Sequence, residues 1–282
     1  MPLFRIDKEN KLERIEEHKF KLEKDIQRLT EANLLEIFSL EFVRTEFALH
    51  QFRIDTLAFD PETNSFVIIE YKRDKNYSVI DQGYAYLSLM LNNKADFILE
   101  YNENADSTLK RKDVDWSQSK VIFLSPSFTN YQKEAINFKD LPIELWEVKR
   151  FKNKTVSYVQ VETSGAKESI NTVSKQDHTI ETVSKEIKVF TEQEHLDNAE
   201  DDIKELYLKF RESVFNLDDD ININPRKFFV DFQYNKKSFT DAVILKRGLK
   251  IYLNLKSGDL DDATGIARDV SNVGHWAMAH MK

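Results

Sequence analysis

One hairpin signal restricts the folds open to this chain more than any other feature of the sequence. Two stretches rich in β-branched and aromatic residues, 51–59 and 65–73, flank the turn sequence 60–64. The second stretch contains the continuous apolar run 66–69, which is typical of a central strand buried on both faces. We therefore predict a β-hairpin whose second arm lies inside a larger sheet.

The register of this hairpin brings charged residues together. If Phe59 pairs with Phe66, Asp55 lies directly opposite Glu70, and like charges at opposed positions are destabilising. Side chains alternate along a strand, so Lys72 shares the face of Glu70. Two carboxylates and an ammonium in one place suit a hard divalent cation with oxygen ligands. In the alternative, the register slips and all three are ordinary solvated charges.

These residues resemble the PD-(D/E)XK nuclease superfamily. The pattern consists of Asp55, an apolar strand ending at Glu70, and Lys72 two positions later. In the following predicted helix, Gln82 and Tyr86 are four positions apart and therefore neighbours on one face. This pair resembles the additional motif of the superfamily branch that includes helicase-associated exonucleases.

A closer resemblance, in residues 53–57 and 67–73, is to a group of bacterial and archaeal proteins related to mismatch-type endonucleases. These proteins combine a nuclease core with a small C-terminal domain called DUF5655. The resemblance covers residues 1–161 well and 190–282 more loosely. It implies an α/β fold, with a restriction-endonuclease-like mixed sheet flanked by helices, plus a small α+β C-terminal domain.

The resemblance also implies roles for individual side chains. Asp55 and Glu70 would hold Mg²⁺ or Mn²⁺, and Lys72 would orient or deprotonate a water molecule and offset developing charge. Gln82 would position the water or the phosphate. The alternative for Gln82 is a solvated side chain.

Accessory residues are expected around this core. The family often places a glutamate on the helix before the hairpin, and Glu23 has a plausible separation from Asp55. Two other acids compete for that role, Glu36 and Glu46, of which Glu46 lies on the predicted first strand of the sheet. Tyr86 is a further accessory candidate. In the alternative, Glu23 is an acid favoured by the helix dipole in a first helical turn, and Tyr86 is a core residue.

Composition limits the remaining function classes. The chain has 282 residues, 41% of them hydrophobic, and no cysteine, which excludes disulfides and zinc-thiolate sites and fits a cytoplasmic protein. No apolar run approaches the ~20 residues of a membrane helix, and we expect no membrane role. The net charge of −8 counts against coating nucleic acid by bulk charge. Local basic clusters at 72–75, 110–112 and 149–152 remain candidates for contact with DNA.

The order of apolar and polar stretches predicts three segments. Residues 1–161 form the nuclease-like domain, 162–189 a polar linker, and 190–282 the small C-terminal domain. The linker expectation rests on its Ser, Thr, Lys and Glu content and on a repeat, 170–175 recurring as 180–185. Within the first domain, residues 96–101 are predicted to form a strand or a strand-like connection.

Two function classes follow. The first is a Mg²⁺- or Mn²⁺-dependent nuclease that hydrolyses DNA, with RNA as a second candidate substrate. The second is a non-catalytic nucleic-acid-binding or protein-interaction module on a nuclease-like fold, since fold does not fix function. A homodimer or a protein partner bound through the C-terminal domain is left open by the sequence.

Overall fold

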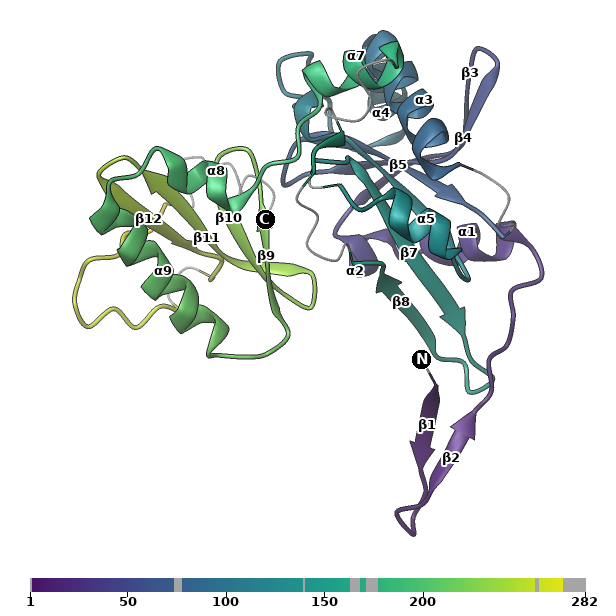
Figure 1. Cartoon of the computed structure of the whole chain (residues 1–282), viewed down its shortest axis with the longest axis horizontal. Coiled ribbons are helices and arrows are strands. Elements are labelled where there is room, and N and C mark those ends of the chain that lie inside the picture. The colour runs from purple at the N-terminus through teal and green to yellow at the C-terminus, as the bar shows by residue number, and fades with distance from the viewer. Residues whose placement is uncertain are drawn as a thin grey trace. The chain divides into compact units, whose positions relative to one another are not determined.

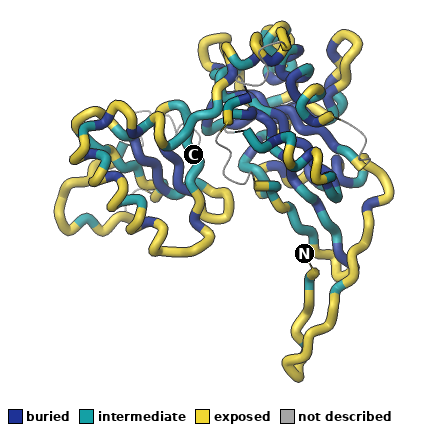
Figure 2. The backbone as a smooth tube through the Cα atoms, in the orientation of Figure 1, coloured by how far each residue is buried: buried dark blue, intermediate teal, exposed yellow. Residues whose placement is uncertain are grey.

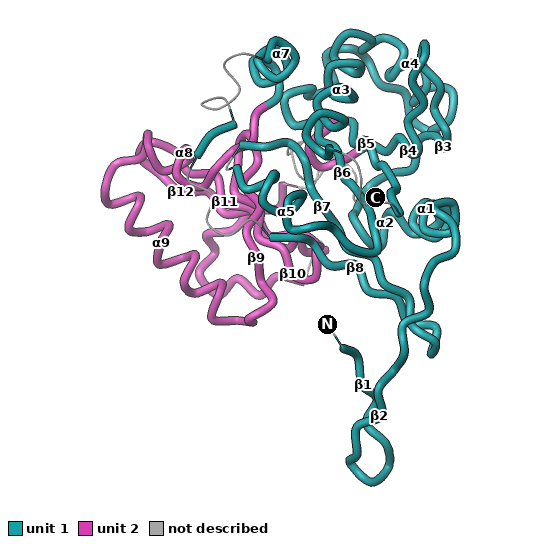
Figure 3. Tube along the Cα trace, turned by 45° about the vertical axis from the view of Figure 1, so that its right-hand side comes forward, with its two compact units in different colours: residues 1–59, 66–187 teal, residues 60–65, 188–282 magenta. Residues whose placement is uncertain are grey.

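The computed structural model describes residues 2–73, 78–138, 140–162, 168–170, 177–256 and 259–270. The chain divides into two compact units (Figure 3). Unit 1 comprises residues 1–59 and 66–187, and unit 2 comprises residues 60–65 and 188–282. Asp74 and Lys75 of the first basic cluster lie outside the described residues, as does 171–176 within the repeat region.

Unit 1 is built on a mixed sheet of six strands in the order β3-β4-β5-β6-β7-β8 (Figure 1). The strands are β3 (Glu41–Leu49), β4 (Phe52–Asp60), β5 (Ser65–Tyr71), β6 (Lys120–Ser125), β7 (Ile143–Arg150) and β8 (Val156–Gln160). The β3–β4 and β7–β8 pairs are antiparallel, whereas β5–β6 and β6–β7 are parallel. The mixed sheet expected from the sequence is confirmed.

Strand β5 is buried along its whole length, as its apolar run predicts (Figure 2). Its side chains alternate between two hydrophobic clusters on opposite faces of the sheet. Phe66 and Ile68 belong to the larger cluster, and Val67 and Ile69 belong to the smaller one. The aromatic rings of Phe59 and Phe66, on either side of the turn, have centroids 5.2 Å apart, in agreement with the hairpin.

Helices cover both faces of this sheet. On the face of the larger cluster lie α3 (Val79–Asn92), α4 (Lys94–Asn104) and α7 (His178–Glu186), which contribute buried residues such as Leu87, Phe97 and Val183. On the other face, α1 (Glu23–Glu31) and α2 (Leu34–Phe38) contribute Ile26 and Leu34. The short elements η1 (Trp116–Gln118) and α5 (Asn130–Ala135) flank β6 in the chain.

Helix α3 begins at a capped end and lies close against the sheet. The Ser78 hydroxyl accepts a hydrogen bond from the backbone N–H of Asp81, as an N-cap residue does. A Cβ atom added to Gly83 would lie 2.4 Å from Ile143 Cδ1. Glycine at this position therefore lets the helix approach β7, and it brings the adjacent Gln82 toward the end of β5.

Two expectations for unit 1 were wrong in detail. Residues 96–101 belong to helix α4 and not to a strand, because Phe97, Ile98 and Tyr101 are buried together on one helical face. The polar segment 162–189 contains α7, whose Ile180 and Val183 join the larger hydrophobic cluster. Their spacing of three residues makes a short apolar stripe that the polar composition conceals.

The N-terminal residues form a separate two-stranded antiparallel sheet from β1 (Leu3–Ile6) and β2 (Leu12–Ile15). Most of its side chains are exposed, including Phe4, Ile6 and Leu12. None of the helices that the structure describes is long and apolar enough to cross a membrane.

Unit 2 is a small α+β unit, as expected. Its antiparallel sheet has the order β12-β11-β10-β9. The strands are β9 (Ile221–Pro225), β10 (Val230–Tyr234), β11 (Lys237–Leu245) and β12 (Gly248–Leu253), and the helices are α8 (Glu192–Asp197) and α9 (Asp201–Phe215). Tyr207 of α9 packs with Val230, Phe232 and Ala242 of the sheet to form the core.

Candidate metal and phosphodiester site

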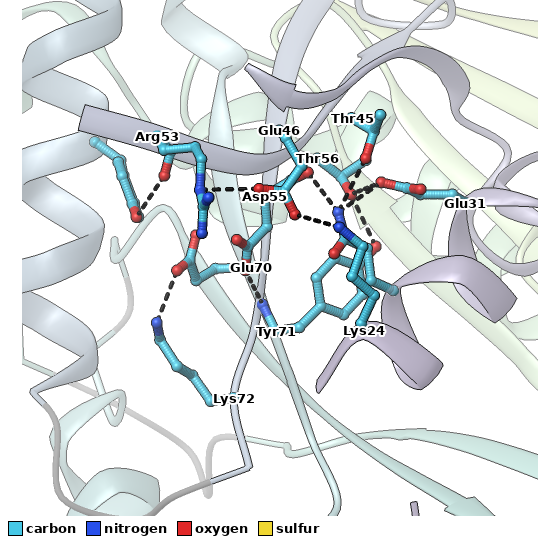
Figure 4. Close-up of polar contacts among 12 residues, drawn as sticks. Lys24, Glu31, Thr45, Glu46, Arg53, Asp55, Thr56, Glu70, Tyr71 and Lys72 are labelled. Atoms are coloured by element: carbon cyan, nitrogen blue, oxygen red, sulfur yellow. Dashed lines mark hydrogen bonds and ion pairs between the residues drawn. The ribbon is translucent and has the colours of Figure 1, made fainter. Parts of the chain in front are cut away.

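Asp55, within β4, and Glu70, near the end of β5, lie beside each other on these neighbouring strands (Figure 4). Glu70 is 3% exposed and Asp55 is half-buried. The backbone N–H of Tyr71 donates a hydrogen bond of 3.1 Å to Asp55 Oδ2, which fixes one carboxylate against the strand that carries the other. The structure thus brings together the two acids that the hairpin register places opposite each other.

Lys72 follows β5 directly and shares the face of Glu70. Its Nζ donates to Glu70 Oε1 at 2.7 Å, and its side chain is 21% exposed. The backbone N–H of Lys72 bonds to Leu124 O at 2.8 Å, so the pairing with β6 continues past the end of the strand. The ammonium is therefore held beside the acidic pair by both side chain and backbone.

Helix α3 supplies two further side chains to the same place. Gln82 Nε2 donates to Glu70 Oε1 at 3.3 Å and to the Tyr86 hydroxyl at 3.2 Å. The Tyr86 hydroxyl in turn donates to Arg53 O at 3.4 Å. Because Gln82 and Tyr86 are one helical turn apart, both reach the strand ends from the helix that Gly83 allows to lie close.

The two oxygens of Glu70 have different surroundings. Oε1 receives hydrogen bonds from Lys72 and Gln82. Oε2 is buried and has no hydrogen-bond partner within the described part of the chain. A buried oxygen without a partner is costly, and here it belongs to a carboxylate next to a second carboxylate. This oxygen is available to a ligand.

The electrostatics of the pair follow from burial and proximity. Burial, and then the charge of Asp55, raise the pKa of Glu70 to about 6, although the hydrogen bond from Lys72 acts in the opposite direction. Burial also raises the pKa of Asp55, against the Tyr71 N–H and the charge of Lys72. A divalent cation would stabilise the ionised forms of both groups. The donor set, two carboxylates with an unpartnered oxygen, fits Mg²⁺ or Mn²⁺.

Glu23 and Glu46 both lie near Asp55, and the charge of each contributes to raising its pKa. Glu23, the first residue of α1, accepts a 2.7 Å hydrogen bond from the backbone N–H of Arg73. Glu46 in β3 forms ion pairs with Lys24 at 3.1 Å and Arg53 at 2.9 Å. Both accessory acids are therefore close to the site, and both have other partners in this structure.

Sequence reasoning missed a supporting network on the opposite side of β4. Gln27 of α1 is 4% exposed, and its Nε2 donates to Asp55 O at 2.8 Å and to Thr45 Oγ1 at 3.1 Å. Thr56 Oγ1 donates to Glu31 at 2.6 Å and lies 3.1 Å from the Tyr71 hydroxyl, from which it can accept. The sequence feature that could have indicated a buried Gln27 is its position next to the apolar Ile26 in α1.

The chain is similar to a protein of Haemophilus influenzae described as "Uncharacterized protein". The two sequences are 52% identical over 269 residues, which cover 95% of this chain and 89% of the relative. Residues 192–282 match the model of the domain of unknown function DUF5655. That domain was expected from the sequence and is confirmed.

Two solved structures resemble part of the chain. One, titled as a complex of EndoMS with double-stranded DNA, is 16% identical and covers 48% of this chain and 50% of its own, with a TM-score of 0.30. The other, a repair endonuclease from Pyrococcus abyssi, is 18% identical and covers 42% of this chain and 43% of its own, with a TM-score of 0.24. The chain thus spans half or less of each solved chain.

Proposed function

This chain belongs to the same protein family as the Haemophilus influenzae relative, and for it we propose a metal-dependent nuclease activity that hydrolyses phosphodiester bonds in DNA. The observation that carries the proposal is the state of Glu70. One of its oxygens is bound by Lys72 and Gln82, and the other is buried without a partner within the described residues, next to Asp55. This arrangement is unfavourable unless a cation or proton joins it.

Asp55 and Glu70 are the residues that would hold the cation. A bound Mg²⁺ or Mn²⁺ would supply a positive charge that polarises a phosphate and acidifies a water molecule. Tyr71 donates its hydrogen bond to Oδ2 of Asp55, and the cation would take the other oxygen of that carboxylate. Glu23 and Glu46 would contribute through water, since each already has a direct partner.

Lys72 is the candidate for handling the water nucleophile. Its ammonium contacts Glu70 Oε1 at 2.7 Å, beside the acidic pair. From that place its positive charge would orient a water molecule or offset negative charge that develops on the phosphate. Gln82, held between Glu70 and Tyr86, would position that water or a phosphate oxygen.

Positive side chains near the pair favour a polyanionic substrate. Lys24 and Arg53 are 49% and 67% exposed at their side chains, and both lie beside the acidic pair (Figure 4). The net charge of the whole chain is −8, so attraction of DNA would depend on local groups of positive side chains such as this one. The choice of DNA rests on the resemblance to the PD-(D/E)XK nucleases.

The test is incubation of the purified chain with labelled linear, circular and single-stranded DNA in Mg²⁺, Mn²⁺ or EDTA. We expect cleavage with metal, none in EDTA, and loss of cleavage in Lys72→Ala. Cut circular DNA would identify an endonuclease. Metal binding without cleavage of any substrate would favour the non-catalytic binding module.

Lys120→Ala is a matched control for Lys72→Ala. Lys120 forms an ion pair with Glu144 at 2.6 Å and its side chain is 23% exposed, close to the 2.7 Å distance of the Lys72–Glu70 pair and to the 21% exposure of Lys72. It lies at the start of β6, where it pairs with Val67 and not with the end of β5. We expect this variant to retain cleavage. Equal activity of both variants would contradict the role of Lys72.

A further inference from the structure

A second pair of acids faces each other within unit 2. Asp231 of β10 and Asp241 of β11 are directly paired in the antiparallel register. Both residues are 0% exposed. Like charges at directly opposed positions repel each other, and burial removes the water that would screen them. Two adjacent apolar strands therefore carry a feature that the packing of unit 2 does not explain.

Only part of each carboxylate is satisfied by hydrogen bonds. Gln233 Nε2 donates to Asp231 Oδ2 at 2.6 Å, and Ser238 Oγ donates to Asp241 Oδ1 at 3.4 Å. Asp231 Oδ1 and Asp241 Oδ2 are buried and have no partner among the residues that the structure describes. Each aspartate is thus held in place by one oxygen and leaves the other without a donor.

A third carboxylate from the same unit reaches this pair. Residues 60–65 are part of unit 2, and one oxygen from each of Glu62, Asp231 and Asp241 lies within 4.8 Å of the other two. Arg226 is also close, with ion pairs to Glu62 at 2.9 Å and Asp60 at 3.7 Å. One guanidinium contributes one positive charge beside three clustered carboxylates.

We propose that Glu62, Asp231 and Asp241 form a binding site for a hard divalent cation, distinct from the Asp55–Glu70 site. Oxygens that share one such ion at 2.3–2.6 Å lie at most about 5 Å apart, and the three oxygens meet this condition. The ion would take the two unpartnered aspartate oxygens as ligands and neutralise the opposed charges. Ca²⁺, Mg²⁺ and Mn²⁺ share this ligand chemistry.

The test separates this site from the proposed nuclease site. Asp55→Asn and Glu70→Gln are introduced together into the full chain, and this parent is titrated with Ca²⁺, Mg²⁺ and Mn²⁺ by calorimetry. We expect at least one of these ions to bind with a stoichiometry of one per chain. Absence of binding by all three would overturn the proposal and would leave the nuclease proposal untouched.

Asp241→Asn in the same parent tests the ligands. We expect loss of at least about tenfold in affinity, whereas Asp219→Asn, at an exposed position, binds like the parent. Thermal unfolding shows that the variant is folded: in EDTA its melting temperature should equal or exceed that of the parent. Added metal should raise the melting temperature of the parent alone. Unchanged affinity in Asp241→Asn would contradict the assignment, and Asp231→Asn provides a second, independent test.

Discussion

Lys72 Nζ lies 2.7 Å from Glu70 Oε1, on a carboxylate that is almost completely buried and whose second oxygen has no partner in the described part of the chain. Lys72 thus contacts only one oxygen of the Glu70 carboxylate, which lies beside the carboxylate of Asp55. Under the proposed function, the pair and its neighbours would supply ligands for a cation, a donor for water and an amide from α3.

The charge of Glu70 should destabilise the metal-free protein. Its pKa of about 6 exceeds the ordinary 4.5, so the folded protein holds the proton more tightly than the unfolded chain does. The free energy of unfolding therefore falls as pH rises between these values, by about 2 kcal/mol in total. In EDTA at pH 7, Glu70→Gln should melt above the parent, and the two should converge near pH 4. An exposed control, Glu181→Gln, should show no such gain. A lower melting temperature for Glu70→Gln at pH 7 would contradict this account.

Gln82 and Tyr86 should differ in their effect on cleavage. Gln82→Leu removes the amide next to Glu70, and we expect kcat to fall by about 10²-fold or more, as for the loss of one positioned donor. Tyr86→Phe removes a hydroxyl that accepts from Gln82 and donates to Arg53 O, so its kcat should fall by less than about tenfold, roughly the loss of a neutral hydrogen bond. Steady-state kinetics on one DNA substrate measures both. A larger loss in Tyr86→Phe would show that Gln82 is not the positioning group.

Gly83 should be required for the close approach of α3 to the sheet. In Gly83→Ala the new Cβ would meet Ile143 Cδ1, and such overpacking costs about 1–3 kcal/mol. Ile143→Val removes that methyl group and should recover part of the loss in the double variant. Urea unfolding of the four proteins gives the coupling energy. Additive effects would contradict the contact.

The acids of unit 2 should make the stability of the metal-free protein depend on pH at higher pH values than Glu70 does. Burial, followed by neighbouring negative charges, raises the pKa of Asp231 to about 7 and that of Asp241 to about 8, while Arg226 opposes both shifts. Stability in EDTA should therefore fall as pH rises from about 4 to about 8. Glu62, Arg226 and Ser238 act on both acids, Gln233 acts on Asp231, and the charge of Asp231 acts on Asp241.

Asp241→Asn should flatten this part of the pH profile. Melting temperatures measured in EDTA between pH 5 and 8 would show the difference, with an exposed substitution, Asp219→Asn, as the control. A profile as steep in the Asp241→Asn variant as in the parent would mean that Asp241 does not hold a proton in the folded state.

The hairpin and its acids were predictable because their physical signals are local. The run 66–69 is continuous and apolar, and β5 is buried throughout. The register argument needed only the positions of Phe59, Phe66, Asp55 and Glu70. Residues 96–101 were misread because six residues of mixed polarity fit a strand as well as a helix. Burial of Tyr101 one turn after Phe97 decides for the helix.

Contacts between segments that are distant in the sequence could not be predicted from local patterns. The hydrogen bond from Gln27 to Asp55 O joins α1 to β4, and no local pattern specifies it. The two aspartates of unit 2 do have a signal in the sequence, because Asp231 and Asp241 each stand among apolar residues of a strand. Glu62, in contrast, lies far from both in sequence, and only the fold brings it to them.

The most direct test of the central claim is the location of Mn²⁺ by anomalous scattering from crystals of the full chain grown with that ion. The account predicts a peak within coordination distance of the carboxylates of both Asp55 and Glu70, and loss of that peak in Asp55→Asn. A fully ordered site in which these carboxylates carry no ion, at Mn²⁺ concentrations that support DNA cleavage, would contradict it.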